Sequence, residues 1–326
     1  MTSRRQLILG AASLGAPLFW SPAAGAADAY PSKLITIVIP QTPGGANDIV
    51  GRAVAQKLAT TLGVPVIVEN RPGAGGNVGT TYVARLPKDG YTLLLTAQSA
   101  QTINPFLYKK ISFDPVKDFD PVMVVGAAPY MLAVNPTFPA KNLREVIALA
   151  KEQPGKINYA SAGNGTLNHL LGEMLKVAAG IDIVHVPYRG AAPAAADVVG
   201  GQVPMTFGSL PGLMPFVKGG QLRAIGVCTE KRSPLAPDLP TLAETIPGLY
   251  ANAWFGLFAP AGTPKEITQK LHAEIAKALD STDMKERFAV LGVEPAPSTP
   301  DQLASLMKAD LLRWGKIVKD SGAQLD

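Results

Sequence analysis

Residues 40–48 read Pro-Gln-Thr-Pro-Gly-Gly-Ala-Asn-Asp and separate an apolar run, 34–39, from a helical pattern that begins at Ile49. The order strand, glycine turn, helix start directs the backbone N–H groups of residues 44–47 at one point, where the helix dipole also favours an anion. Asp48 fits a supporting role in the first helical turn. A tight turn alone explains the glycines equally well, so this first glycine loop predicts only half of an anion site.

A second glycine loop, residues 161–166, reads Ser-Ala-Gly-Asn-Gly-Thr. It lies between a predicted strand, 157–160, and a predicted helix, 166–179. Either Asn164 or Thr166 is suited to cap that helix, which leaves the neighbouring amides free for an anion. Two such loops, far apart in the sequence, predict a cleft that closes on a small ligand.

The chain around these loops alternates strands and helices, a pattern typical of α/β folds with largely parallel sheets. Two apolar stretches, 118–135 and 254–259, interrupt the alternation and are expected to cross between domains. We therefore predict a discontinuous first domain, 30–129 plus 252–326, and an inserted second domain, 130–251.

Composition excludes several classes of protein. Hydrophobic residues make up 47% of the 326 residues and charged residues 17%, which predicts a globular chain. The formal charge of +5 is modest and not clustered, so no nucleic-acid surface is expected. The single cysteine, Cys228, permits no internal disulfide, and three dispersed histidines predict no metal site.

Residues 1–26 have the pattern of an export signal. The twin arginine Arg4-Arg5 precedes an apolar stretch, and Ala24-Gly25-Ala26 forms a small-residue cleavage pattern. The apolar stretch is shorter than the roughly 20 residues that span a bilayer. We expect a mature protein in the periplasm, cut near Ala26, with twin-arginine and general export left open.

Two catalytic interpretations were weighed. The glycine run at residues 73–79 does not have the G-x-G-x-x-G spacing, because Val78 occupies its last position, so no nucleotide cofactor is expected. An exported hydrolase with Ser161 or Ser209 as nucleophile stays an alternative, since His169 follows the second glycine loop closely. His185 is expected to be structural. No cofactor of any kind is predicted.

Several motifs resemble the Bug family, the extracytoplasmic solute receptors of tripartite tricarboxylate transporters. The most specific is Glu-Asn-Arg-Pro-Gly-Ala-Gly-Gly-Asn at residues 69–77. Further matching runs are Pro-Gly-Gly at 43–45, Asp-Gly-Tyr-Thr at 89–92, His-Val-Pro-Tyr-Arg-Gly at 185–190, Leu-Pro-Thr-Leu-Ala-Glu at 239–244 and Ala-Pro-Ala-Gly-Thr-Pro at 259–264. The resemblance covers essentially the whole mature chain.

The resemblance implies a two-domain, type II periplasmic-binding-protein (Venus flytrap) fold that holds a small carboxylate between its domains. By the same resemblance, the ligand-binding residues are Thr42, Gly44, Gly45, Ala46, Asn47, Gln98, Ser99, Gly163, Asn164, Gly165 and Thr166. The polar pair Gln41-Thr42 departs from the aromatic or proline that the family often has there, which leaves the ligand's identity open.

We therefore expect a non-catalytic, monomeric receptor that delivers a carboxylate to the membrane permease subunits of a tripartite transporter. A receptor of the same fold that feeds a signalling partner is the other alternative, because the sequence has no motif that distinguishes the two.

Overall fold

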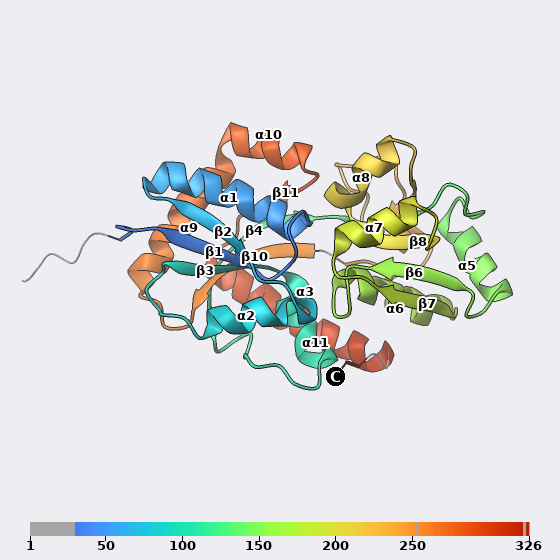
Figure 1. Ribbon diagram of the computed structural model, residues 1–326, viewed down its shortest axis with the longest axis horizontal. Helices are drawn as coiled ribbons and strands as arrows, with labels where there is room; N and C mark the ends of the chain where they lie inside the picture. Colours follow the sequence, from blue (N-terminus) through green and yellow to red (C-terminus); the bar gives the residue numbers. More distant parts are fainter. Residues whose placement is uncertain (1–29, 252, 322–323, 326) are drawn as a thin grey trace, which may run out of the picture.

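Two lobes lie side by side in the computed structural model, which describes residues 30–251, 253–321 and 324–325 (Figure 1). The first lobe contains β1 (Ile35–Ile39), α1 (Ala46–Leu62), β2 (Val66–Asn70), the 3-10 turn η1 (Ala74–Gly76), α2 (Asn77–Ala84), β3 (Thr92–Ala97), α3 (Gln98–Thr102), α4 (Asn104–Leu107), β4 (Phe119–Ala128), β10 (Ala253–Pro260), α9 (Lys265–Asp280), α10 (Thr282–Val290), β11 (Glu294–Pro295) and α11 (Pro300–Ser321).

The second lobe is formed by the intervening chain. It contains β5 (Tyr130–Val134), α5 (Leu143–Glu152), β6 (Ile157–Ser161), α6 (Leu167–Ala179), β7 (Ile183–Pro187), α7 (Ala191–Val199), β8 (Met205–Ser209), α8 (Leu210–Lys218), β9 (Arg223–Val227) and the 3-10 turn η2 (Leu242–Glu244).

Each lobe is built on a mixed sheet. The first has the order β11-β4-β10-β3-β1-β2 and the second β7-β6-β8-β5-β9. Strands β2 and β3 run parallel to β1, with Ile35 opposite Val66 and Thr36 opposite Thr92. Strands β7 and β8 likewise run parallel to β6. The carboxyl ends of these strands therefore share one edge in each lobe, which is where α/β sheets carry their ligand loops. The two-domain α/β prediction is confirmed.

The chain passes between the lobes twice. Strand β4 belongs to the first sheet and β5, after Pro129, to the second, while β10 returns to the first sheet. These passages coincide with the two apolar stretches in the sequence. The domain boundaries 30–129 plus 252–326 and 130–251 stay a prediction.

Apolar side chains fill both faces of each sheet. In the first lobe, one face packs Val54, Leu58 and Leu271 from α1 and α9, and the other packs Leu303 and Met307 from α11. In the second lobe, α5 and α6 cover one face, and α7 and α8 cover the other. Helix α11 continues past the first lobe, because Trp314 and Val318 join the core of the second lobe.

Local sequence signals explain some of the helix starts. The side chain of Asn142 accepts a hydrogen bond from the Glu145 N–H at 3.0 Å, as the capping pattern predicts. Thr299 and Gln302 exchange the two bonds of a capping box before α11. Residues 263–266, Thr-Pro-Lys-Glu, also have the spacing of a capping box, but this prediction is wrong, because the Thr263 hydroxyl donates to the Pro260 carbonyl oxygen and α9 has no side-chain cap.

No helix in the described part of the chain is long and apolar enough to cross a membrane. The export signal predicted at residues 1–26 lies outside the described residues.

Candidate ligand-binding site

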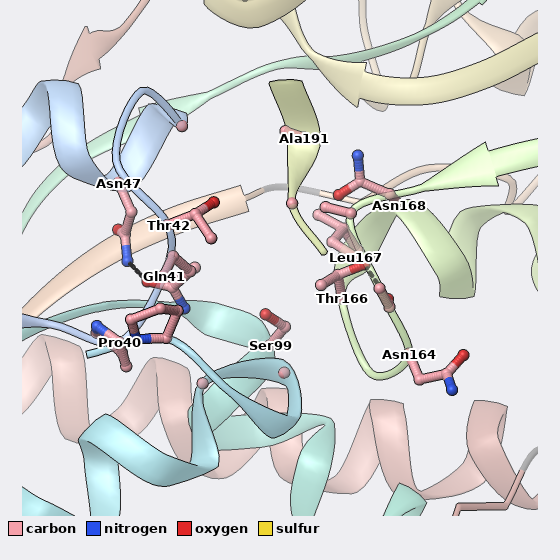
Figure 2. Close-up of a pocket in the computed structure, with 18 of the residues that line it drawn as sticks. Pro40, Gln41, Thr42, Asn47, Ser99, Asn164, Thr166, Leu167, Asn168 and Ala191 are labelled. Carbon is pink, nitrogen blue, oxygen red and sulfur yellow. Dashed lines mark hydrogen bonds between the residues drawn. The ribbon is translucent and has the colours of Figure 1, made fainter. Parts of the chain in front are cut away.

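A cavity of about 710 Å³ lies between the two lobes (Figure 2). Its walls come from the loops that follow strands β1, β2, β3, β6, β7 and β8. The lining residues are Pro40, Gln41, Thr42, Gly45, Ala46, Asn47, Pro72, Gly73, Ala74, Gly75, Gly76, Ala97, Ser99, Tyr108, Tyr130, Ala162, Gly163, Asn164, Thr166, Leu167, Asn168, Pro187, Tyr188, Arg189, Gly190, Ala191, Ser209 and Phe255. The volume is in the range of pockets that enclose small metabolites.

The first glycine loop is shaped by Asp48. Its carboxylate accepts the Gly44 N–H at 3.0 Å, the Asn70 amide at 2.9 Å and the Arg52 guanidinium at 2.9 Å. Burial raises the pKa of Asp48, but the hydrogen bonds from Arg52, Gly44 and Asn70 outweigh it and hold that pKa below its ordinary value. Asp48 therefore supports the loop, as expected, and occupies the Gly44 amide that the sequence assigned to the ligand.

The second glycine loop is held by its own side chains and by α6. The Gly163 N–H donates to the Ser161 Oγ at 3.1 Å, and the Thr166 hydroxyl donates to the Gly163 carbonyl oxygen at 2.7 Å. The Gly165 N–H donates to His169 Nδ1 at 3.4 Å. Gly163 and Gly165 have φ of +121° and +80°, which favour glycine.

Three helix N-termini meet at the cavity. The N-cap residues of α1, α6 and α7 are Gly45, Thr166 and Gly190, and all three line it. None of these N-caps makes a side-chain hydrogen bond to the first turn of its helix. The unsatisfied N–H groups and positive dipole ends of the three helices therefore face one space, an arrangement that favours an anion.

Among the described residues, Arg189 is the one charged residue that lines the cavity. It follows β7 and is exposed, and the sequence did not assign it to the ligand. The described lining contains no Asp, Glu or Lys, so helix ends and one guanidinium make the cavity electropositive. The position of Arg189 after a parallel strand is the signal by which the sequence could have identified it.

The two lobes touch at the rim of the cavity. The Tyr108 hydroxyl of the first lobe donates to the Asn164 carbonyl oxygen of the second at 3.0 Å. Thr42 lies against Gly190, where an added Cβ would stand 2.5 Å from the Thr42 Oγ1. The lobes are therefore closed on each other.

Most residues that the sequence assigned to the ligand line this cavity. They are Thr42, Gly45, Ala46, Asn47, Ser99, Gly163, Asn164 and Thr166. The side chain of Asn47 donates to Gln41 Oε1 within the first loop (Figure 2). Whether each residue contacts a ligand stays a prediction.

Three predicted residues lie elsewhere. Gly44 borders a smaller neighbouring cavity, and Gly165 packs toward Tyr108 behind the second loop. Gln98 is 2% exposed and donates to Asp310 on α11 at 2.8 Å. Its side chain points into the first lobe because Gln98 is the first residue of α3.

The sequence reading missed other lining residues. The glycine run from Gly73 to Gly76, which the sequence did not assign to the ligand, lines the cavity. Gly79 at the end of the run is closely packed, since a Cβ there would stand 2.6 Å from the Arg71 carbonyl oxygen. Tyr108 and Tyr130 lie in none of the motifs quoted above and are brought to the cavity only by the fold.

The nucleophile interpretation of Ser161 needs a correction. Its hydroxyl pairs with His185 Nε2 at 2.6 Å, not with His169. Ser161 is fully buried and does not line the cavity. Burial, then His169 and Lys176, lower the pKa of His185 to about 3. The nearby Glu173 carboxylate accepts a hydrogen bond from the Tyr159 hydroxyl at 2.8 Å. It therefore interacts with a tyrosine and not with the serine–histidine pair.

Metal-ligand geometry was sought as well. Across the described residues, no group of three or more His, Cys, Asp or Glu side chains is placed to hold a metal ion. Buried Cys228 is a free thiol whose pKa is raised by burial.

Comparisons with known proteins agree with this architecture. The model of the family described as "Tripartite tricarboxylate transporter family receptor" matches residues 50–323. Protein BugT of Bordetella pertussis is 36% identical over 321 residues, which cover 98% of this chain and 96% of BugT.

Solved structures are similar over nearly the whole chain. The structure of R. palustris Rpa4515 with adipate has a TM-score of 0.88 at 34% identity and covers 91% of this chain and 100% of that one. MatC from Rhodopseudomonas palustris with bound malate has a TM-score of 0.84 at 33% identity, with 89% and 100% covered.

Two lobes joined by crossover strands around a large cavity define a solute-binding protein of the periplasmic class. The chain belongs to the tripartite tricarboxylate transporter receptor family, in which the Bug proteins are found. The resemblance that the sequence motifs indicated is confirmed.

Proposed function

We propose that this chain captures a small carboxylate in the cavity between its lobes and delivers it to the permease subunits of a tripartite transporter. The observation that carries the proposal is the meeting of three uncapped helix N-termini, those of α1, α6 and α7, at one cavity. Backbone amides at helix ends bind a carboxylate without a buried salt bridge.

The ligands of similar structures support this choice. Rpa4515 was solved with adipate and MatC with malate, and both ligands are carboxylic acids. In this chain, the amides of Gly45, Ala46 and Asn47 hold the carboxylate from the first lobe. Thr166 and the first turn of α6 hold it from the second.

Binding without catalysis is part of the proposal. The serine–histidine hydrogen bond in the described part of the chain joins buried Ser161 to partly buried His185, and neither residue lines the cavity. Arg189 at the cavity edge is suited to attract the anion and to orient it, because an exposed guanidinium steers negative ligands without a large desolvation cost.

The place of action follows from the family and the N-terminal pattern. Export by the signal at residues 1–26 brings the mature receptor to the periplasm, where it acts as a monomer beside its permease.

A ligand screen tests the function directly. Thermal unfolding of the mature protein is followed with succinate, malate, adipate, citrate, benzoate, glutamate and two uncharged controls, glucose and succinamide. A true ligand at one hundred times its Kd stabilises the fold by about 2.7 kcal/mol. Stabilisation by at least one acid, but not by its uncharged amide, is expected. Stabilisation by glucose alone would overturn the proposal.

A further inference from the structure

A second cavity of about 210 Å³ adjoins the first, and we call it the side cavity. It shares five lining residues with the main cavity, namely Gly45, Ala46, Asn168, Ala191 and Ser209. The two spaces therefore meet between the N-terminus of α1 and the N-termini of α6 and α7. A ligand anchored at those N-termini lies at the opening of the side cavity.

The remaining walls of the side cavity are small or apolar. They are formed by Gly44, Ala192, Ala195, Thr206, Phe207, Gly208, Gly212, Leu213 and Phe216. None of the described residues that line the side cavity is charged. The hydroxyl of Thr206 is already engaged, because it donates to the Ala160 carbonyl oxygen at 2.9 Å. Such a space favours an apolar group and disfavours a second charge.

Polar groups are confined to the junction of the two cavities. The Asn168 amide donates to the Phe207 carbonyl oxygen at 2.6 Å, which fixes its orientation. Figure 2 shows Asn168 and Ala191 on the side of the cavity that faces Thr42 and Asn47. Ser209, the last residue of β8, contributes a hydroxyl at the same place. The polarity therefore falls from the helix ends, through Asn168 and Ser209, to Leu213 and Phe216.

We propose that the side cavity is a subsite for an apolar part of the ligand. The inference rests on the proposed function, because it places the carboxylate at the helix ends and the apolar part beyond them. The ligand class it names is a carboxylate that carries an alkyl chain or a ring. An apolar cavity of about 150 Å³ is enough to hold benzene, so a space of about 210 Å³ accommodates a group of that size.

Ala192 gives a variant that fills the side cavity without disturbing the core. It is exposed, lies in the first turn of α7 and lines the side cavity but not the main one. Ala192→Leu therefore occupies the subsite with a good helix former. Ala196→Leu is the matched control, because Ala196 is exposed on the same helix and lines neither cavity.

The test is a calorimetric titration of the mature protein and both variants with butanoate, hexanoate, octanoate and succinate. In the unmodified chain, affinity for the monocarboxylates is expected to rise by about fourfold for each added CH₂ that enters the subsite. Ala196→Leu retains this gain. Ala192→Leu loses most of it and keeps the affinity for succinate within about threefold, because leucine fills the space that the longer chains need.

The outcomes separate the two proposals. If neither succinate nor any other acid of the screen binds, the proposed function itself fails. If succinate binds but none of the three monocarboxylates does, the subsite is overturned while the receptor function stands. A gain with chain length that Ala192→Leu leaves unchanged also overturns it, because the alkyl chain then lies in the main cavity.

Discussion

At the scale of single residues, backbone conformation decides which hydrogen-bond donors the cavity presents to a ligand. Gly45 and Thr166 have extended φ and ψ, −80° and 167° for Gly45, and −80° and 159° for Thr166. This conformation directs the N–H groups in the first turns of α1 and α6 toward the cavity. The donors are main-chain groups, so most side-chain substitutions leave them in place.

Proline at the first helical position removes one of these donors selectively. Ala46 is the first residue of α1, and the extended Gly45 before it is compatible with a following proline. We expect Ala46→Pro to weaken binding of the carboxylate found in the screen by roughly 10- to 100-fold, the effect of losing one charge-assisted hydrogen bond. Isothermal titration calorimetry measures the change.

The control is the same substitution on a distant helix. Thr282 is exposed, begins α10 and also follows an extended residue, Ser281. Thr282→Pro should leave the affinity unchanged and the melting temperature close to that of the parent. Equal affinity in Ala46→Pro and the parent would show that the α1 amide does not contact the ligand.

Residue patterns alone predicted the backbone of the site better than its side chains. The positions of Gly45, Asn47, Gly163 and Thr166 follow from glycine turns between strand and helix, which are local signals. Gln98 follows a strand too, yet its side chain turns away to Asp310, more than two hundred residues later in the chain. A partner that distant leaves no local trace in the sequence.

At the scale of elements, β7 and α6 hold the second glycine loop from behind. The rings of His169 and His185 stack with centroids 4.1 Å apart, and His185 stacks on Tyr159 at 5.0 Å. His169 Nδ1 accepts the Gly165 N–H, and His185 reaches Gly163 through the Ser161 hydroxyl. The His169 imidazole is neutral, because a protonated Nδ1 accepts no hydrogen bond, and two charged rings at this distance would repel each other.

This pair makes stability depend on pH. Burial lowers the pKa of His169, while Glu173 opposes that shift and Lys176 adds to it; burial, His169 and Lys176 lower the pKa of His185 to about 3. A depressed histidine pKa means that the unfolded chain binds more protons, so stability is full above the unfolded pKa of about 6.5 and falls as the pH drops toward 3.

The expected result is a free energy of unfolding that decreases between pH 6.5 and pH 4. Each histidine contributes at most about 1.4 kcal/mol per pH unit, and solvent screening reduces this for His185, which is only partly buried. Urea unfolding of the parent and of His185→Gln measures the two slopes. A slope in His185→Gln as steep as in the parent would assign the effect to other groups, and His272→Gln on α9 is the control.

Elements with regular patterns were predictable, and irregular ones were not. The strand predicted at 157–160 and the helix predicted at 166–179 agree with β6 and α6 to within one residue at each end. Helix α8 was missed because Pro211, Gly212 and Pro215 argue against a helix, and Pro215 does lie inside it. Its N-cap residue, Ser209, lines the cavity, although the sequence indicated this serine only as a possible nucleophile.

At the scale of the whole molecule, the lobes are coupled by a helix and by the cavity rim. Helix α11 packs Leu303 and Met307 against the first sheet and fully buried Trp314 in the core of the second lobe. The two-domain prediction followed from the two apolar stretches that cross between the lobes, but the sharing of α11 did not follow from the sequence, because an amphipathic pattern does not say which surface covers it.

Closure of the lobes should depend on Tyr108. Its hydroxyl donates to the Asn164 carbonyl oxygen across the rim, so the hydrogen bond exists only when the lobes are together. Burial raises the pKa of Tyr108 to about 12, so the hydroxyl keeps its proton at neutral pH. This contact stabilises the closed form, so less of the ligand's binding free energy is lost in closing the lobes. Tyr108→Phe should therefore weaken ligand binding by about two- to tenfold, mainly through faster dissociation.

Tyr30→Phe is the matched control, because the Tyr30 hydroxyl donates to the Gly90 carbonyl oxygen at 2.7 Å within the first lobe. Both variants lose one tyrosine hydrogen bond to a backbone oxygen, but only Tyr108→Phe loses one between lobes. Stopped-flow dissociation rates and small-angle X-ray scattering of the ligand-free proteins distinguish them. We expect a larger radius of gyration and a faster dissociation rate for Tyr108→Phe alone. The same dissociation rate in both variants would mean that the rim contact does not set the closed population.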